Sequence, residues 1–276
     1  MKYLIACDLD GSLLNDLSEI SDLSKKVLRH LEDLGHAIII ATGRPYSGAI
    51  DKYMELNLST PLITDNGGTI ENPMDPNYPK TRSYIPLHIM HDLFLFSKPF
   101  LVSALYSTKS TIYAYKYDRR LEMYFSGSFS DNVIEKDLTE FEVEPSSLIF
   151  LVDVNHKEKL EDYIDSKYSK MIAYRLWGTD RKYGIYEIYV KHVSKASAIK
   201  QVQHSLGFEN KQVIAIGDGI NDVEMIHESN WGVAMKNAVS PVKQVANAIT
   251  KENNNDDGLA KYLVEFFKLK LEGEKK

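Results

Sequence analysis

Several features that define common protein classes are absent from this sequence of 276 residues. The single cysteine, Cys7, cannot form an internal disulfide, and no cysteine and histidine cluster has the spacing of a zinc site. No apolar run reaches the roughly 18 residues of a membrane-spanning helix. The apolar stretch near the N-terminus meets Asp8 too soon for a secretory signal. We therefore expect a soluble, cytoplasmic protein.

Positive charge is also scarce. The chain has 33 Lys and Arg against 39 Asp and Glu, a formal net charge of −6, and it contains no long basic run. Nucleic acids and anionic membranes are therefore not expected as partners. Neither the phosphate-binding Gly-x4-Gly-Lys-Ser/Thr pattern nor the dinucleotide Gly-x-Gly-x-x-Gly pattern occurs, which disfavours the common nucleotide-binding folds. We expect a small-molecule partner and either a monomer or a homodimer.

Four short apolar runs each end in small and polar residues. Continuous apolar runs of this length are typical of strands that are buried on both faces of a parallel sheet. The composition, 43% hydrophobic and 26% charged, permits a packed core. The runs are Tyr3–Cys7, Ala37–Ala41, Pro61–Thr64 and Val213–Ile216.

Helical patterns fill the intervals between these runs. Ser21 is a candidate N-cap for a helix that ends near Gly35, and further helices are expected over 45–56, 194–206 and 259–271, with another beginning at Ser240-Pro241. This alternation predicts the α/β class, with a doubly wound parallel, Rossmann-like core. Ligands of such sheets gather beyond the carboxyl ends of the strands, where all four polar breaks are expected.

The middle of the chain has a different pattern. It holds most of the 17 tyrosines, some of them alternating over 112–117, and it suggests helices over 87–97 and 157–168. A hairpin is expected between 171–176 and 184–190, across a loop over 177–183. We interpret residues 83–190 as an inserted α+β cap domain, and residues 1–82 and 191–276 as the catalytic core.

Acidic residues follow two of the predicted strands. Asp8 and Asp10 are two positions apart, so their carboxylates share a face of an extended chain, and Gly11 permits an immediate turn. The segment Gly217–Asp222 brings more acidic oxygens to a second strand end. A single Asp-x-Asp pair more often caps a helix or a turn. Two acidic clusters at equivalent strand ends instead favour the binding of a hard cation such as Mg²⁺.

Taken in order, these motifs resemble the haloacid dehalogenase (HAD) superfamily, and more narrowly its Cof-like phosphatases with a type IIB cap. The resemblance rests on Asp8–Leu14, Ala41–Arg44, Lys195 and Gly217–Asp222, and it covers nearly the whole chain. Ser12 stands where the family usually has Thr, and Ala196 follows Lys195 where Gly is usual. Ser keeps the hydroxyl, and Ala is well tolerated at a helix start.

The resemblance implies a Mg²⁺-dependent phosphatase that hydrolyses a small phosphorylated metabolite through an aspartyl phosphate. Asp8 is then the nucleophile and Asp10 the acid and base, with Thr42 and Lys195 completing the catalytic set. The expected metal-binding residues are Asp8, Asp10, Asp218 and Asp222, with Asp222 acting from behind the inner ligands. The expected substrate-binding and phosphate-binding residues are Leu9, Thr42, Gly43, Lys195, Asn221 and Arg175.

Other interpretations remain open at this stage. A phosphomutase on the same fold and a non-catalytic sensor of a phosphorylated metabolite share many of these features. A receiver-like signalling domain also uses an acidic pair, Thr and Lys, but is much shorter. Arg175 and the loop that follows it are expected to reach the leaving group, whereas the alternating tyrosines are more typical of sheet packing.

Overall fold

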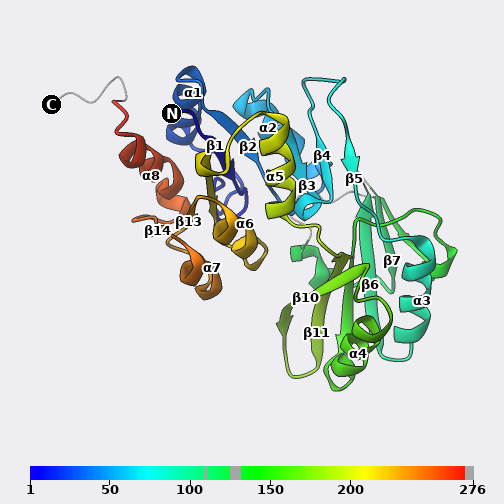
Figure 1. Ribbon diagram of the computed structural model, residues 1–276. Coiled ribbons are helices and arrows are strands. Elements are labelled where there is room, and N and C mark those ends of the chain that lie inside the picture. Colours follow the sequence, from blue (N-terminus) through cyan, green and yellow to red (C-terminus); the bar gives the residue numbers. More distant parts are fainter. Residues whose placement is uncertain (109–110, 125–131, 271–276) are drawn as a thin grey trace. The chain divides into compact units, whose positions relative to one another are not determined.

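The computed structural model describes residues 1–108, 111–124 and 132–270, which form two compact units (Figure 1). The first unit comprises Met1–Gly43, Ala49–Lys80 and the described chain from Ser194 onward. The second comprises Arg44–Gly48 and the described residues of Thr81–Val193. The second unit is thus an insertion into the first.

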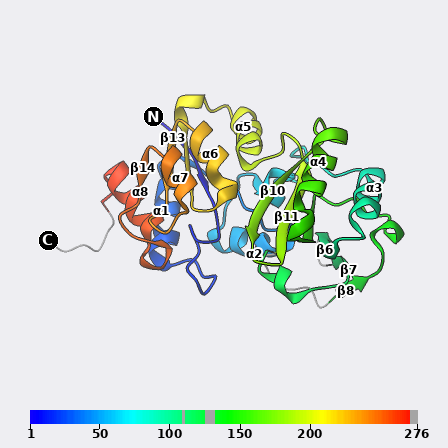
Figure 2. The same cartoon turned by 90° about the horizontal axis from the view of Figure 1, so that it is seen from below.

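A parallel sheet of five strands forms the centre of the first unit, in the order β14-β13-β12-β1-β2. Every residue of β1 is buried, because helices cover both faces of the sheet (Figure 2). The fold class predicted from the apolar runs is therefore confirmed. The strands are β1 (Leu4–Cys7), β2 (Ala37–Ile40), β12 (Val213–Gly217), β13 (Trp231–Ala234) and β14 (Ala248–Ile249).

The helices of this unit, one of which (α2) has its first three residues in the second unit, begin close to the predicted positions. Ser21 caps the first of them by accepting a hydrogen bond from the Ser24 amide at 3.0 Å. None of the helices in the described ranges has the length and apolar character needed to cross a membrane. They are α1 (Asp22–Asp33), α2 (Tyr46–Leu56), α5 (Lys195–Ser205), α6 (Val223–Glu228), α7 (Ser240–Val245) and α8 (Gly258–Phe267).

Strands β1 and β12 are parallel neighbours at the point where the direction of winding reverses. From β1 the chain continues to β2 on one side, and from β12 it continues to β13 on the other. A crevice forms at the carboxyl ends of two such strands because their connections diverge. The amide of Asp8 donates to the Ile216 carbonyl at 3.0 Å, so the residues after β1 and β12 emerge side by side at this point.

A third predicted strand, β3 (Leu62–Thr64), follows the polar break after β2. Ala41 and Ile63 form a parallel bridge, and β3 pairs with β4 (Thr69–Glu71) in an antiparallel hairpin. The turn of this hairpin contains Asn66 and Gly67, both with positive φ. A Cβ atom on Gly67 would lie 2.3 Å from the Ser194 carbonyl oxygen, so this turn packs directly against the start of α5.

The second unit has one six-stranded sheet in the order β10-β11-β9-β6-β7-β8. All its pairings are antiparallel except β7 with β8. The short strand β5 (Thr81–Arg82) opens the unit, and its helices are α3 (Leu87–Ser97) and α4 (Lys157–Lys167). The sheet strands are β6 (Leu101–Thr108), β7 (Thr111–Tyr115), β8 (Asn132–Glu135), β9 (Ser147–Asp153), β10 (Ile172–Thr179) and β11 (Tyr183–Val190).

Helices α3 and α4 contribute to one hydrophobic cluster of this sheet, which also contains Tyr106 and Phe150. A smaller cluster on the alternate residues of the same strands, around Leu105 and Ile149, contains no described residue of either helix. Helices α3 and α4 therefore pack on one face of this sheet, while Leu121 from the short 3-10 helix Arg119–Tyr124 packs on the opposite face, and side chains alternate between the two faces along each strand.

Three local predictions are corrected by the structure. The hairpin turn is Asp180–Lys182 rather than 177–183, because the Asp180 carboxylate accepts the amides of Lys182 and Tyr183 and tightens the turn. Tyr117 leaves the face of Tyr113 because Lys116, with φ 51°, breaks the alternation. Helix α8 ends at Phe267, where Lys268 adopts a left-handed conformation, and the predicted end at Leu271 lies outside the described residues.

Candidate active site

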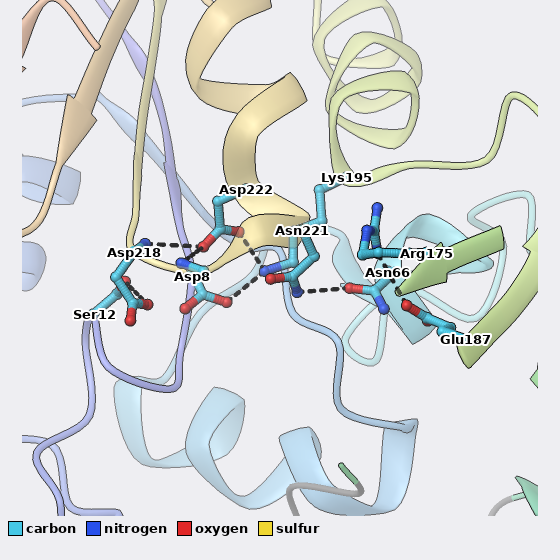
Figure 3. A network of polar contacts seen from close by, with 10 residues as sticks. Asp8, Ser12, Asn66, Arg175, Glu187, Lys195, Asp218, Asn221 and Asp222 are labelled. Atoms are coloured by element: carbon cyan, nitrogen blue, oxygen red, sulfur yellow. Dashed lines mark hydrogen bonds and ion pairs between the residues drawn. The ribbon is translucent and has the colours of Figure 1, made fainter. Parts of the chain in front are cut away.

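The ammonium group of Lys195 joins two carboxylates at the end of β1 (Figure 3). Its Nζ lies 2.6 Å from Asp8 Oδ1 and 2.6 Å from Asp222 Oδ1, and only 1% of Lys195 is exposed. Lys195 is the first residue of α5, and Ser194 fixes that helix end by accepting from the Ser197 amide at 3.2 Å. The helix start therefore delivers the cation directly to Asp8.

Burial and charge act in opposite directions on this cluster. Burial alone would lower the pKa of Lys195, but the carboxylates of Asp222 and Asp8 outweigh it and raise that pKa, so the amine stays protonated. Burial raises the pKa of Asp8 well above its usual value, and repulsion from Asp222 adds to this while Lys195 opposes it. One lysine is thus too little positive charge for the carboxylates around it.

Asp222 is held by hydrogen bonds at both carboxylate oxygens. Oδ1 accepts from Lys195, and Oδ2 accepts from the amides of Asp218 and Gly219, each at 2.9 Å. Only 1% of the residue is exposed. Asp222 therefore fixes both the Lys195 side chain and the turn after β12. This agrees with the expectation that Asp222 supports the residues that bind the metal directly.

Asp218 lies beside the turn that follows Asp8. Ser12 Oγ donates to Asp218 Oδ1 at 3.1 Å. Gly11 has φ 72°, and a Cβ atom there would lie 2.3 Å from Asp218 Oδ2, so only glycine permits this approach. The turn after β1 therefore wraps closely around the Asp218 carboxylate.

The carboxylates of Asp8, Asp218 and Asp222 form a group that suits a metal ion. One oxygen from each lies within 4.8 Å of the others. Burial raises the pKa of Asp218 to about 7, and repulsion from Asp222 contributes to that shift. A hard divalent cation binds through such oxygens and would compensate the excess negative charge, so the donor set fits it.

The remaining residues predicted near Asp8 lie in the same unit. Asp10 is half-buried, forms a bridge with Leu14, and its charge helps to raise the pKa of Asp218. Leu9 has a fully buried side chain, so only its main chain can meet a ligand. Thr42 is buried, and its carbonyl accepts from the Asn66 amide at 3.0 Å.

Asn66, to which the sequence analysis gave no role, lies beside both Gly43 and Asn221. Asn221 Nδ2 donates to Asn66 Oδ1 at 2.8 Å, and a Cβ atom on Gly43 would lie 3.0 Å from the same oxygen. Asn66 occupies a left-handed position in the turn after β3. An Asn-Gly pair after a buried strand is the sequence signal that marks such a turn.

Arg175 belongs to the second unit, where it pairs with Glu187. Arg175 Nη1 lies 3.0 Å from Glu187 Oε2, which also accepts from Trp177 Nε1 at 3.1 Å. The guanidinium carbon lies 5.0 Å from the centre of the Tyr189 ring and 5.7 Å from that of Trp177. Glu187 is only 3% exposed. The sequence analysis missed Glu187, although one acid in the middle of an apolar strand is a signal for a buried partner.

Cys7, the residue before the candidate nucleophile Asp8, has an unreactive thiol. Cys7 is buried in β1, and burial together with the Asp8 charge raises the pKa of its thiol to about 12. The thiolate form is therefore negligible at neutral pH, which agrees with a packing role.

Comparison with known proteins agrees with this combination of fold and acidic site. A family model of haloacid dehalogenase-like hydrolases matches residues 5–263, and the chain belongs to that family. The resemblance inferred from the motifs is confirmed. The protein is an enzyme of the phosphoric monoester hydrolase class, a phosphatase.

Two curated relatives cover almost the whole chain. Both are from Bacillus subtilis (strain 168) and are named 5-amino-6-(5-phospho-D-ribitylamino)uracil phosphatase, YitU and YcsE. YitU is 31% identical over 269 residues, 97% of this chain and 98% of its own. YcsE is 30% identical over 260 residues, 94% of this chain and 93% of its own.

Solved structures share the fold along the full length. A haloacid dehalogenase-like hydrolase from Bacteroides thetaiotaomicron has a TM-score of 0.77 at 25% identity, covering 97% of this chain and 100% of its own. A structure described as the HAD subclass IIB sugar phosphatase BT4131 has a TM-score of 0.79 at 20% identity, covering 98% and 100%. At that identity the second likeness concerns the fold alone.

We expect Asp218→Asn to stabilise the metal-free protein more at pH 8 than at pH 6. The pKa of Asp218 rises from an ordinary 3.8 to about 7 on folding, so the folded state keeps a proton that the unfolded chain has released. Stability is therefore lost as the pH rises between these values, and Asn does not titrate. Thermal unfolding in EDTA at both pH values measures the effect, with Asp75→Asn at an exposed turn as the control. An equal effect at both pH values would contradict this assignment.

Proposed function

We propose that the protein is a Mg²⁺-dependent phosphatase that hydrolyses a small phosphomonoester through an aspartyl phosphate on Asp8. The observation that carries the proposal is the buried contact of 2.6 Å between Lys195 and Asp8, at a strand end shared with Asp218. A nucleophilic carboxylate must be ionised, and the Lys195 ammonium opposes the rise in the pKa of Asp8 that burial causes.

The oxygens of Asp8 and Asp218, with the main-chain carbonyl of Asp10, would hold Mg²⁺ in this proposal. When bound, the ion supplies positive charge to the phosphoryl oxygens and relieves repulsion between anionic substrate and anionic site. Asp222 supports them from behind, because its own oxygens are occupied by Lys195 and two amides.

The chain's own residues carry the two chemical steps. An oxygen of Asp8 attacks phosphorus and the bond to the leaving alkoxide breaks, while Asp10 gives its proton to that alkoxide. A water molecule then attacks phosphorus, Asp10 takes the proton from the water, and the bond to Asp8 breaks. Inorganic phosphate leaves and both carboxylates return to their starting states.

We assign the phosphoryl oxygens to donors near the strand ends. Leu9 and Gly43 offer main-chain amides, Thr42 a hydroxyl, and Lys195 an ammonium group. Asn221 offers its amide, whose orientation is set by the hydrogen bond to Asn66. Fixed donors of this kind stabilise the transition state because they do not need to reorganise during the reaction.

The second unit is assigned as the cap that selects the organic part of the substrate. The face opposite α3 and α4 carries Arg175, held by Glu187, together with the rings of Trp177 and Tyr189. Arginine and aromatic rings together suit a planar, polar group. The two relatives named for a phosphoribitylaminouracil support such a group, a nitrogen heterocycle on a phosphorylated polyol, as the substrate class.

Asp8→Asn is expected to abolish turnover, by at least about a thousandfold, while leaving the fold intact. The amide is nearly isosteric but lacks the ionised oxygen that attacks phosphorus. Release of inorganic phosphate measures the loss, and circular dichroism checks the fold. A folded Asp8→Asn protein that turns over normally would refute Asp8 as the nucleophile. If the wild-type protein converts a hexose phosphate into its isomer and releases no inorganic phosphate, the result would instead support a phosphomutase.

Removal of divalent cations is expected to stop hydrolysis and to lower the melting temperature. EDTA leaves the acidic cluster with Lys195 as its compensating charge, and added Mg²⁺ should restore both rate and stability. Phosphate release and differential scanning fluorimetry follow the two effects in one titration. Activity that persists unchanged in EDTA would exclude the metal from the mechanism.

Trp177→Leu is expected to lower kcat/KM about tenfold for 5-amino-6-(5-phospho-D-ribitylamino)uracil, because stacking on a base contributes about 1–3 kcal/mol. The rate with ribitol 5-phosphate, which lacks the ring, should change less than about twofold. Trp231→Leu is the matched control, since Trp231 is the only other tryptophan and lies in the first unit, bonded to Tyr262. An equal loss with both substrates would remove Trp177 from ring recognition.

A further inference from the structure

Three asparagines precede α8 in a run that the sequence marks only as low-complexity. The second of them, Asn254, is just 8% exposed, and its side chain reaches back to the turn region after β1. Asn254 Nδ2 donates to the Leu14 carbonyl at 3.1 Å and to Asp16 Oδ1 at 3.0 Å. Residues about 240 positions apart are thus joined through one buried amide.

The neighbouring asparagine reinforces this connection. Asn255 Nδ2 donates to Asp16 Oδ2 at 2.9 Å, and Asn255 Oδ1 accepts from the Asp16 amide at 2.9 Å. The two asparagines lower the pKa of Asp16, because they bond to its charged form. The side chains of the segment before α8 therefore hold the loop after β1 at both main-chain and side-chain groups of that loop.

Asn237, in the loop after β13, links this connection to the acidic cluster. Its Oδ1 accepts from the Asn254 amide at 3.1 Å, so its amino group must point the other way. Nδ2 donates to the Gly11 carbonyl at 2.7 Å and lies 3.5 Å from Asp218 Oδ2. The main-chain N–H of Asn254, as the donor, thus decides which end of the Asn237 side chain faces the site.

The Asp218 carboxylate consequently has a donor beside each oxygen. Ser12 Oγ approaches Oδ1 at 3.1 Å and Asn237 Nδ2 approaches Oδ2 at 3.5 Å. Asn237 also holds Gly11, the residue whose missing Cβ leaves room for that carboxylate. Outer hydrogen bonds of this kind fix the direction in which a carboxylate presents its remaining lone pairs.

We propose that Asn237 is a positioning residue of the metal site, oriented by Asn254, that holds Asp218 and the Gly11 turn in the arrangement that binds a divalent cation. The inference rests on the metal assignment in the proposed function and extends it to residues outside the motifs. Asn237 is exposed to solvent, so its truncation leaves no buried cavity and tests position rather than packing.

The test titrates Mn²⁺ into EDTA-stripped, desalted full-length protein and follows free Mn²⁺ by electron paramagnetic resonance. Mn²⁺ favours the same oxygen ligands as Mg²⁺. Asn237→Ala is expected to raise the Kd about 10–100-fold, with the melting temperature of the metal-free protein nearly unchanged. Excess Mg²⁺ should return kcat to within about threefold of the wild-type value.

Asn247→Ala is the matched control. Its Oδ1 also accepts a main-chain hydrogen bond, from Gly232 at 2.7 Å, and it is likewise exposed. Its Kd should equal that of the wild type.

Each other outcome is informative. A wild-type protein that does not bind Mn²⁺ would overturn the metal assignment itself. If the wild-type protein binds Mn²⁺ and Asn237→Ala binds it with the same Kd, the positioning role alone would be overturned. If Asn237→Ala then also has a lower melting temperature, the contacts of Asn237 only hold the loops together.

Discussion

The buried ammonium group of Lys195 is the interaction on which the arrangement of the site depends. Bringing ions out of water costs several kcal/mol each, and this is offset only where charges meet at close range with their hydrogen bonds satisfied. Lys195 meets both conditions with Asp8 and Asp222, at 2.6 Å from each. Burial raises the pKa values of Asp8 and Asp218, and repulsion from Asp222 adds to this because Lys195 remains outnumbered by the acids. This excess of negative charge favours a divalent cation at the site, as the proposed function requires.

Neutral groups then decide where the charged ones point. Asp222 is oriented by two amides, Asn221 by Asn66, and Asp218 by Ser12 and Asn237. These groups come from turns after β1, β12 and β13 of the parallel sheet, and from the turn after β3, which is bridged to the residue that follows β2. In the second unit a charged residue has this part, since Glu187 orients Arg175 across the pair of strands β10 and β11. The fold supplies the charges through its motifs and their orientation through the loops between them.

The parts that sequence reasoning predicted well are those with strong local signals. Apolar runs followed by Asp8, Gly43 and Asp218 are visible directly, and parallel strands must bring their carboxyl ends to one edge. The turn at Asp180 depends on two local hydrogen bonds, and the break in the alternation at Lys116 depends on one φ value; the periodicity of the sequence reports neither. Asn237 and Asn254 act over more than 220 residues of sequence from their partners Gly11 and Leu14. Their role follows from the register of the sheet, which no local pattern contains.

The pairing of β1 with β12 also has a consequence for synthesis of the protein. Leu4 is hydrogen-bonded in the same ladder as Val213, so the central strand lacks one neighbour until most of the chain has left the ribosome. Closing so long a loop is entropically slow, and apolar β1 stays exposed on that side meanwhile. The inserted unit, by contrast, has all its strands within one continuous stretch of chain. Nascent chains should therefore fold the inserted unit first and assemble the acidic cluster of the first unit last, which delays phosphatase activity until translation is almost complete.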